Sequence, residues 1–231
     1  MSTAREDILG NIRRSLHRGP ALPEAADRLA ERVAAHRRNL IPARAAALDP
    51  AARIELFVAM AEEVQTTVAR VAGQEDVPGE VARYLAAENL PAELVMAPDR
   101  ALDAIPWASR PLLNIRRDKA EAGDVVSLTP CLAAVAETGT LMLVSGAATP
   151  TTLNFLPETH IVVVQAGQIV AGYEDGWDLV RSRGGDWPRT INLITGPSRT
   201  GDIEQRIQLG AHGPRRLHVV LIEEPDGRAE G

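Results

Sequence analysis

The sequence predicts an α/β protein with a mainly parallel, three-layer α/β/α sheet, preceded by N-terminal helices. The chain has 231 residues, enough to bury one sizeable core without disulfides. Beyond residue 110, short apolar runs alternate with turn or helical segments, an order typical of α/β folds. Four runs are almost continuously apolar, as strands covered on both faces of a parallel sheet are; they lie within residues 140–144, 160–164, 190–195 and 217–222.

The N-terminal part of the chain has a helical pattern. Ile8, Leu9, Ile12 and Leu16 share one face at helical spacing, so residues 4–17 are expected to form a short amphipathic helix that needs a partner. Helical composition continues over residues 24–47, either as a mobile segment or at a subunit interface, which leaves a homo-oligomer open. We therefore divide the chain into an extension (1–48), an α/β domain (49–222) and a disordered tail (223–231).

The α/β domain is expected to open with a helix. Asp49 can cap it and Pro50 suits its first position. Another helix is expected at 78–89, and strands at 93–97, 112–115 and 124–128. The buried stripe expected from the first helix consists of Ile54, Phe57, Val58, Ala61, Val64, Val68 and Val71.

Composition excludes several classes of protein. A net charge of −6 with 3% aromatic residues argues against a nucleic-acid surface. Cys131 is the only cysteine, so the chain can hold no internal disulfide or cysteine-ligated cluster, and no spacing predicts a metal site. The charged start of the chain lacks a signal-peptide pattern, and no apolar run approaches the ~20 residues that span a bilayer. We therefore expect a cytoplasmic protein.

The stretch ITGPSRTGDIE, residues 194–204, is the first candidate for a binding corner. A strand leads into Gly196 and Ser198, and a helix is expected to follow, whose first amides would hold an anion. The Arg199 guanidinium would add charged hydrogen-bond donors, and Ser198 and Thr200 would add hydroxyl donors. The alternative is a simple helix cap, in which Asp202 and Glu204 complement the helix dipole.

Two further segments carry titratable groups. Residues 130–137 are expected to form a helix that ends near Gly139, which would place Glu137 at the unfavourable negative end of its dipole. A carboxylate at this helix end is unfavourable, so Glu137 is either a functional group or an exposed side chain at a frayed helix end. His212, between Gly210 and Gly213, would act as acid, base or anion partner, or belong to a structural turn.

The remaining candidates have plain structural interpretations. His160 and His218 adjoin apolar strands and are expected to be core or edge residues. Cys131 is expected to be a small buried hydrophobic residue. No Rossmann fingerprint or complete phosphate loop is present, so a classical dinucleotide site is not expected.

Three stretches resemble the lactate utilization protein C family, the stand-alone form of the LUD domain. They are AETGTLMLVSG (136–146), LPETHIVVV (156–164) and TGPSRTGDIEQRIQLGAHGPRRLHVVLI (195–222), within a resemblance that covers about 50–222. The resemblance implies a fold similar to the ribose-phosphate isomerase and CoA-transferase superfamily. It also implies a part in L-lactate oxidation to pyruvate with two iron–sulfur partner proteins, and no cofactor in this chain. Gly201 and Ala211 depart from the usual family pattern.

Family motifs map onto the candidate site residue by residue. Glu137 is the candidate catalytic group, and the binding residues are Thr138, Gly139, Thr140, Gly196, Ser198, Arg199, Thr200, Asp202, Glu204 and His212. Together they would suit a small anionic ligand such as lactate or pyruvate, or a phosphorylated cofactor. Three classes stay open: a subunit of a lactate-oxidising system, an independent CoA-transferase-like or isomerase-like enzyme, and a non-catalytic assembly or regulatory protein.

Overall fold

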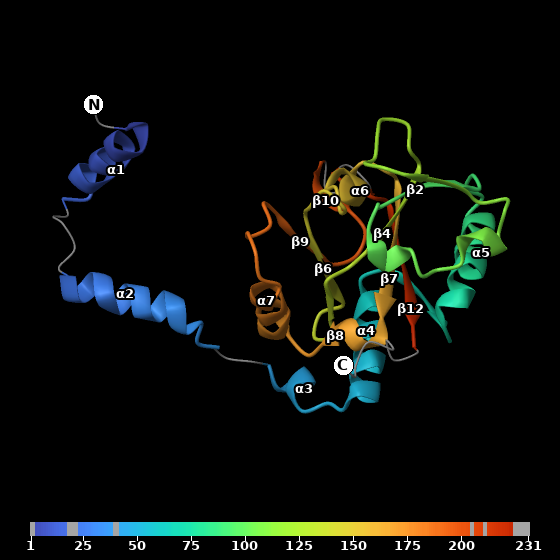
Figure 1. Cartoon of the computed structure of the whole chain (residues 1–231), viewed down its shortest axis with the longest axis horizontal. Helices are drawn as coiled ribbons and strands as arrows, with labels where there is room; N and C mark the ends of the chain where they lie inside the picture. The colour runs from blue at the N-terminus through green and yellow to red at the C-terminus, as the bar shows by residue number, and fades with distance from the viewer. Residues whose placement is uncertain (1–2, 18–22, 39–41, 204–205, 210–211, 224–231) are drawn as a thin grey trace. The chain divides into compact units, whose positions relative to one another are not determined.

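The computed structural model describes residues 3–17, 23–38, 42–203, 206–209 and 212–223 (Figure 1). The chain divides into two compact units, Met1–Leu40 and Ile41–Gly231. The short helix α3 (Ala43–Ala46) belongs to the second unit: Ala45 is buried, and the Arg44 guanidinium donates to the carbonyl of Glu137. Contacts thus begin before residue 48, where the sequence places the domain boundary. Of the expected tail, residues 224–231 lie outside the described part.

The first unit consists of α1 (Ala4–Ser15) and α2 (Pro23–Ala35). A capping box starts α1, in which the Thr3 hydroxyl accepts from the Glu6 N–H and the Glu6 carboxylate accepts from the Thr3 N–H. The expected helix at 4–17 is confirmed, whereas the helix expected over 24–47 is two helices, α2 and α3. Neither α1 nor α2 has a buried residue, and their exposed large apolar side chains are Ile8, Ile12, Leu16, Leu29 and Val33.

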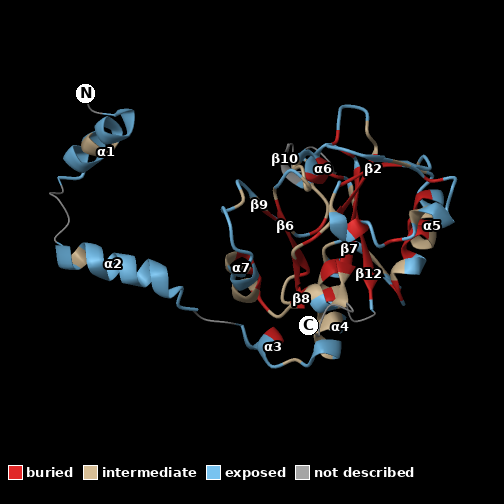
Figure 2. Ribbon diagram, viewed as in Figure 1, coloured by how far each residue is buried: buried red, intermediate tan, exposed pale blue. Residues whose placement is uncertain are grey.

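A six-stranded parallel sheet forms the centre of the second unit. Its order is β1 (Thr67–Val71), β12 (Arg216–Ile222), β7 (Thr159–Gln165), β4 (Val126–Pro130), β2 (Glu93–Met96) and β3 (Asn114–Arg117). The apolar runs expected at 160–164 and 217–222 become the adjacent central strands β7 and β12, and Figure 2 shows buried residues gathered along them. The predicted α/β class with a mainly parallel sheet is confirmed.

Both faces of this sheet are covered. Helix α5 (Val77–Ala87) packs on one face, where Val81 and Leu85 share a core with Leu128. On the other face, Phe57 and Ala61 of α4 (Pro50–Glu63) share a core with β7, β12 and a second sheet. That sheet has the order β8 (Ile169–Val170), β5 (Ala133–Val135), β6 (Thr140–Val144) and β9 (Ile191–Ile194), with α7 (Tyr173–Ser182) packed on it.

Short elements complete the second unit. They are α6 (Thr152–Phe155), the strands β10 (Arg199–Ile203) and β11 (Arg206–Leu209), and the 3-10 helices η1 (Gln74–Asp76), η2 (Arg100–Leu102), η3 (Trp107–Ser109) and η4 (Ala166–Gln168). No helix among the described residues combines the length and the apolar character needed to cross a membrane.

The four-stranded sheet corrects two expectations. Residues 140–144 and 190–195 are strands, but β6 and β9 pair antiparallel with each other and lie outside the parallel sheet. A continuous apolar run reports burial on both faces and does not report the pairing partner. Residues 130–137 are not a helix, because Ala133–Val135 pairs antiparallel with Thr140–Met142 through a tight turn at Gly139, whose φ is +65°.

The helix at residue 49 is confirmed but shorter than its apolar stripe. Asp49 accepts a hydrogen bond from the Ala52 N–H at 2.8 Å, and Pro50 is the first helical residue, as expected. The helix ends at Glu63, and Gln65 has a φ of +67°. Val68 and Val71 therefore belong to β1, where alternation along a strand rather than helical spacing sets their burial.

No helix follows Ser198. Strands β10 (Arg199–Ile203) and β11 (Arg206–Leu209) pair antiparallel, with Arg199 opposite Leu209. Gly201 would cost up to ~1 kcal/mol inside a helical turn, and a comparable cost in a strand means that it does not by itself decide between the two. The expectation that helix amides hold an anion at this corner is therefore wrong, and any ligand there must be bound by other groups.

Candidate functional site

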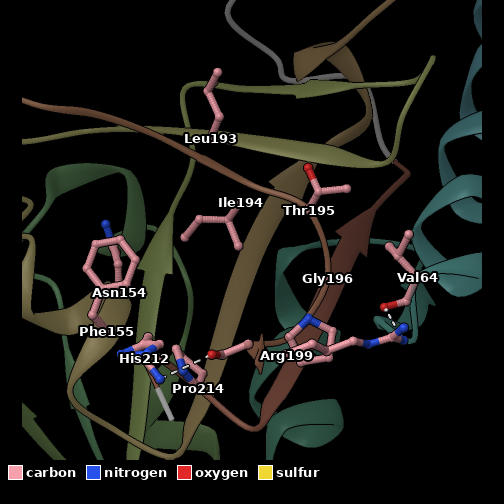
Figure 3. A pocket seen from close by; sticks show the side chains of 13 residues that line it. Val64, Asn154, Phe155, Leu193, Ile194, Thr195, Gly196, Arg199, His212 and Pro214 are labelled. Carbon is pink, nitrogen blue, oxygen red and sulfur yellow. Dashed lines mark hydrogen bonds between the residues drawn. The ribbon is translucent and has the colours of Figure 1, made fainter. Parts of the chain in front are cut away.

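A cavity of about 440 Å³ opens where the loop after β9 meets the loop before β12. Figure 3 shows Asn154, Phe155 and His212 on one side of it and Val64 and Arg199 on the other. Val64 precedes β1, Phe155 precedes β7 and Pro214 precedes β12. The cavity therefore lies at the amino ends of these parallel strands, whereas ligands in open α/β sheets usually sit at the carboxyl ends.

Close backbone contacts hold the two loops together. The Ser198 N–H donates to the Pro214 carbonyl at 2.8 Å, and the His212 N–H donates to Ser198 Oγ at 3.4 Å. Gly196 has a φ of +76°, and a Cβ there would lie 2.6 Å from the Val64 carbonyl oxygen. Only glycine permits this close approach to Val64. The contacts of Ser198 with Pro214 and His212 bring two of the three predicted segments together.

The lining of this cavity is rich in hydrogen-bond donors. Arg199 donates to the Val64 carbonyl at 3.3 Å, which leaves most of its five N–H groups available. Ser198, Thr195 and Asn154 supply hydroxyl and amide groups, and His212 supplies an imidazole. Within the part of the chain that the structure describes, no Asp or Glu lines the cavity. A guanidinium with no described carboxylate beside it, among neutral donors, favours an anion.

Glu137 lies in the turn between β5 and β6 and does not line this cavity. Its N–H donates to the Ala171 carbonyl at 3.2 Å. Its Oε2 lies 3.6 Å from where a Cβ on Gly172 would be, and Gly172 is the N-cap of α7. The carboxylate thus neighbours the positive end of a helix dipole, which stabilises it, and not the negative end that the sequence predicted.

Four hydroxyl groups connect the Glu137 turn with the cavity. Thr140 is fully buried, and its Oγ1 lies 2.7 Å from Thr138 Oγ1, 2.8 Å from the Tyr173 hydroxyl and 2.6 Å from Thr195 Oγ1. Thr138 also donates to Tyr173 at 3.0 Å. Since each hydroxyl carries one proton, Thr140 must donate to Thr138, and Tyr173 and Thr195 must donate to Thr140. Thr195 is thereby fixed at the cavity edge.

Replacing Thr140 with valine should destabilise the protein by about 1–2 kcal/mol, because half-buried Tyr173 loses the acceptor that it shares with the exposed Thr195. Thr138→Val is the matched control: it removes two of the contacts instead of three, so its effect should be smaller. Urea unfolding of both variants measures the difference. Equal losses would contradict the central place of Thr140.

The structure places the remaining predicted residues as follows. Gly196, Ser198, Arg199 and His212 line the cavity, whereas Thr138, Gly139 and Thr140 belong to the β5–β6 turn and the start of β6. Thr200 and Asp202 lie on β10, but their side chains are not described. Glu204 lies outside the described residues. Sequence reasoning missed Asn154, Tyr173 and Thr195. The stretch TTLNFLP places a polar Asn between Leu and Phe, the signal that could have found Asn154.

The buried titratable groups are core residues, as expected. Burial lowers the pKa of His160 to about 3, and its Nε2 lies 2.8 Å from Thr129 Oγ1. Burial also lowers the pKa of His218 to about 4; this ring stacks on Tyr84 with 3.8 Å between centroids. Burial raises the pKa of the Cys131 thiol to about 12, so the thiol is neutral and unreactive as a nucleophile near neutral pH.

Comparisons with known proteins agree with this fold. A family model described as the LUD domain matches residues 54–222. A crystal structure of a DUF162 family protein from Deinococcus radiodurans is similar, with a TM-score of 0.59 and 27% sequence identity over 76% of this chain and 99% of that one.

Curated relatives share part of the sequence. Lactate utilization protein C of Geobacillus sp. strain WCH70 is 33% identical over 131 residues, which cover 55% of this chain and 53% of the relative. The protein of the same name from Bacillus subtilis strain 168 is 34% identical over 109 residues (46% and 45%), and that from Deinococcus radiodurans is 36% identical over 113 residues (48% and 51%). The chain spans about half the length of the curated relatives it matches. Since the family model covers most of the chain, and the relatives carry the name that the sequence motifs predict, this protein belongs to the LUD domain family.

Proposed function

We propose that this protein binds a small organic carboxylate in the cavity at Arg199 and that this binding serves lactate utilization. One observation carries the proposal: the described lining presents Arg199, His212 and neutral donors without a carboxylate. A charge-assisted hydrogen bond from a guanidinium suits a carboxylate ligand. The names of the curated relatives point to lactate or its oxidation product as that ligand.

In this proposal the chain works as one subunit of an oxidising system and does not carry the electrons itself. An iron–sulfur cluster is held by several Cys thiolates, and this chain has one cysteine, which is buried with a raised pKa. The clusters would therefore lie on partner proteins. Glu137 is assigned no contact with the anion, because it does not line the cavity and its carboxylate lies beside the start of α7.

Arg199→Ala is expected to weaken carboxylate binding by about 10- to 100-fold, the loss of one charge-assisted hydrogen bond and its charge. Isothermal calorimetry with L-lactate, pyruvate and inorganic phosphate measures the affinities. A ligand at about a hundred times its dissociation constant should also stabilise the fold by ~2.7 kcal/mol.

Arg215→Ala is the matched control for this experiment. Arg215 is exposed, follows the lining residue Pro214 in the chain, and contacts Glu158 at 3.8 Å without lining the cavity. Its replacement should leave the affinity unchanged. If no carboxylate binds to the wild type, or if Arg199→Ala binds as tightly as Arg215→Ala, the proposal is wrong.

A further inference from the structure

All strands of this sheet run in the same direction, but the order in which the chain adds them reverses between β4 and β2. The chain runs from β2 to β3 on one side, and from β4 through the second sheet to β7 on the other. These connections also leave on opposite faces: Leu102 and Leu113 of the first pack in the α5 core, whereas Ala134 and Leu141 of the second pack in the α4 core. A crevice at such a reversal, at the carboxyl ends of the strands, is the usual ligand position in open α/β sheets.

A second cavity, of about 120 Å³, lies at this reversal. Asp99 and Ala101 line it from the connection after β2, and Pro130 to Leu132 line it from the end of β4. Leu143 adds an apolar wall from the second sheet. At about 30 Å³ per water, the volume corresponds to about four waters, which is the size of a phosphate ion or a three-carbon acid.

Asn154 lines both this cavity and the one at Arg199. It is only 5% exposed, yet its side-chain amide has no hydrogen-bond partner among the residues that the structure describes. Its amide atoms are not fully enclosed by protein, so they face open cavity space and can pair there with water or with a ligand. The amide therefore offers two N–H donors and one oxygen to whatever occupies these cavities.

The other polar groups of the second cavity are mostly engaged. Thr149 donates to the Val144 carbonyl at 2.7 Å, and Thr129 lies 2.8 Å from His160 Nε2. Gln168 uses both ends of its amide, and the Asp99 carboxylate accepts from the Ala101 N–H. Arg183, the exposed C-cap of α7, has neither an ion pair nor a hydrogen bond with any described residue. The groups without a partner are thus a guanidinium and an amide; the Asp99 carboxylate keeps its negative charge, which the Arg183 guanidinium has to offset for an anion to bind.

We propose that the second cavity is a separate anion site, in which Arg183 and Asn154 bind the carboxylate or phosphate of a small molecule whose apolar part contacts Leu132 and Leu143. It is independent of the carboxylate site at Arg199 except through Asn154, the residue that lines both cavities. The protein would accordingly hold two small anionic groups at once, on either side of one buried amide.

Calorimetry of Arg199→Ala isolates the second site, because that variant lacks the cation of the first. L-lactate and inorganic phosphate are the two probes, and they separate a carboxylate from a phosphate ligand. Residual binding of one probe should fall at least about tenfold when Arg183→Ala is added, as expected for a charge-assisted hydrogen bond. Arg181→Ala is the control, since Arg181 is paired with Asp178 at 2.8 Å and lines neither cavity. Asn154→Ala should weaken both sites.

Absence of residual binding in Arg199→Ala, or residual binding that Arg183→Ala leaves intact, overturns this proposal. Neither result contradicts the first site, which fails if the wild type binds no carboxylate or if Arg199→Ala binds as tightly as Arg215→Ala.

Discussion

Gly139→Ala is expected to destabilise the protein by about 4 kcal/mol. About 1–2 kcal/mol comes from the left-handed backbone, which an alanine tolerates poorly. The remainder comes from overlap, because a Cβ on Gly139 would lie 2.5 Å from the Ala61 backbone nitrogen in α4, and overpacking costs about 1–3 kcal/mol. The β5–β6 turn would have to move off the helix, so the hydroxyl network at Thr140 should weaken as well. Urea unfolding measures the loss.

Gly184→Ala separates the two contributions. Gly184 has a φ of +66°, almost the same as the +65° of Gly139, but a Cβ there would meet nothing within 4 Å. Its replacement should therefore cost only the backbone part, about 1–2 kcal/mol. Losses of similar size in the two variants would show that contact with α4 does not constrain the turn.

Acid should destabilise the fold through its two buried histidines. Burial keeps the pKa of His160 at about 3 and that of His218 at about 4, whereas an unfolded histidine titrates at about 6.5. The unfolded chain therefore binds more protons below about pH 6.5, and the free energy of unfolding falls as pH decreases. From about pH 7 to about pH 5, each histidine should cost about 2 kcal/mol, and the pair about 4 kcal/mol.

The side chains around His218 determine how far its pKa is lowered. His218 Nε2 lies 3.4 Å from Glu80 Oε1, too far for a strong hydrogen bond, and Glu80 is already paired with Arg83 at 2.6 Å. Glu80 raises the pKa of His218, but desolvation is the larger influence. The Tyr84 ring stacked on His218 keeps water away from it.

Unfolding free energies across this pH range in His160→Gln measure the contribution of one ring. The mean slope between about pH 7 and about pH 5 should decrease by about 1 kcal/mol per pH unit, which approaches the full one-proton slope of about 1.4 kcal/mol only below the unfolded pKa. His36→Gln is the control, because His36 is exposed in the first unit and its loss should leave the slope unchanged. A slope in His160→Gln equal to that of the wild type would mean that the buried ring accepts its proton without unfolding.

Much of the fold follows from local patterns. The runs at β7 and β12 are continuously apolar because both faces of a central parallel strand are covered, and a run of that kind is visible in any sequence. Asp49 and Pro50 start α4 through capping and ring geometry that depend on a few adjacent residues. The helix predictions failed at residues 130–137 and 196–204. The apolar runs there are short, and glycines permit turns that a helical pattern does not reveal.

The candidate site was predictable only in part. Arg199, Ser198 and His212 were expected from residue types and from their place beside strands, and they line one cavity. Their approach depends on Gly196 against Val64 and on Ser198 against Pro214, contacts between segments far apart in the sequence. Asn154 was missed because a polar residue in a short helix looks exposed until the packing of α6 on β4 and β7 buries it.

The sequence by itself determined the α/β class, the family, the buried strands, the absence of cysteine ligands and the donor-rich loop at Arg199. These properties depend on composition, on periodicity and on residues that are neighbours in the chain. Only the tertiary structure decided which strands form the second sheet, that Glu137 lies apart from Arg199, and that Asn154 lies between two cavities. Those outcomes depend on long-range pairing and on close approaches such as Gly139 on α4, which no local pattern encodes.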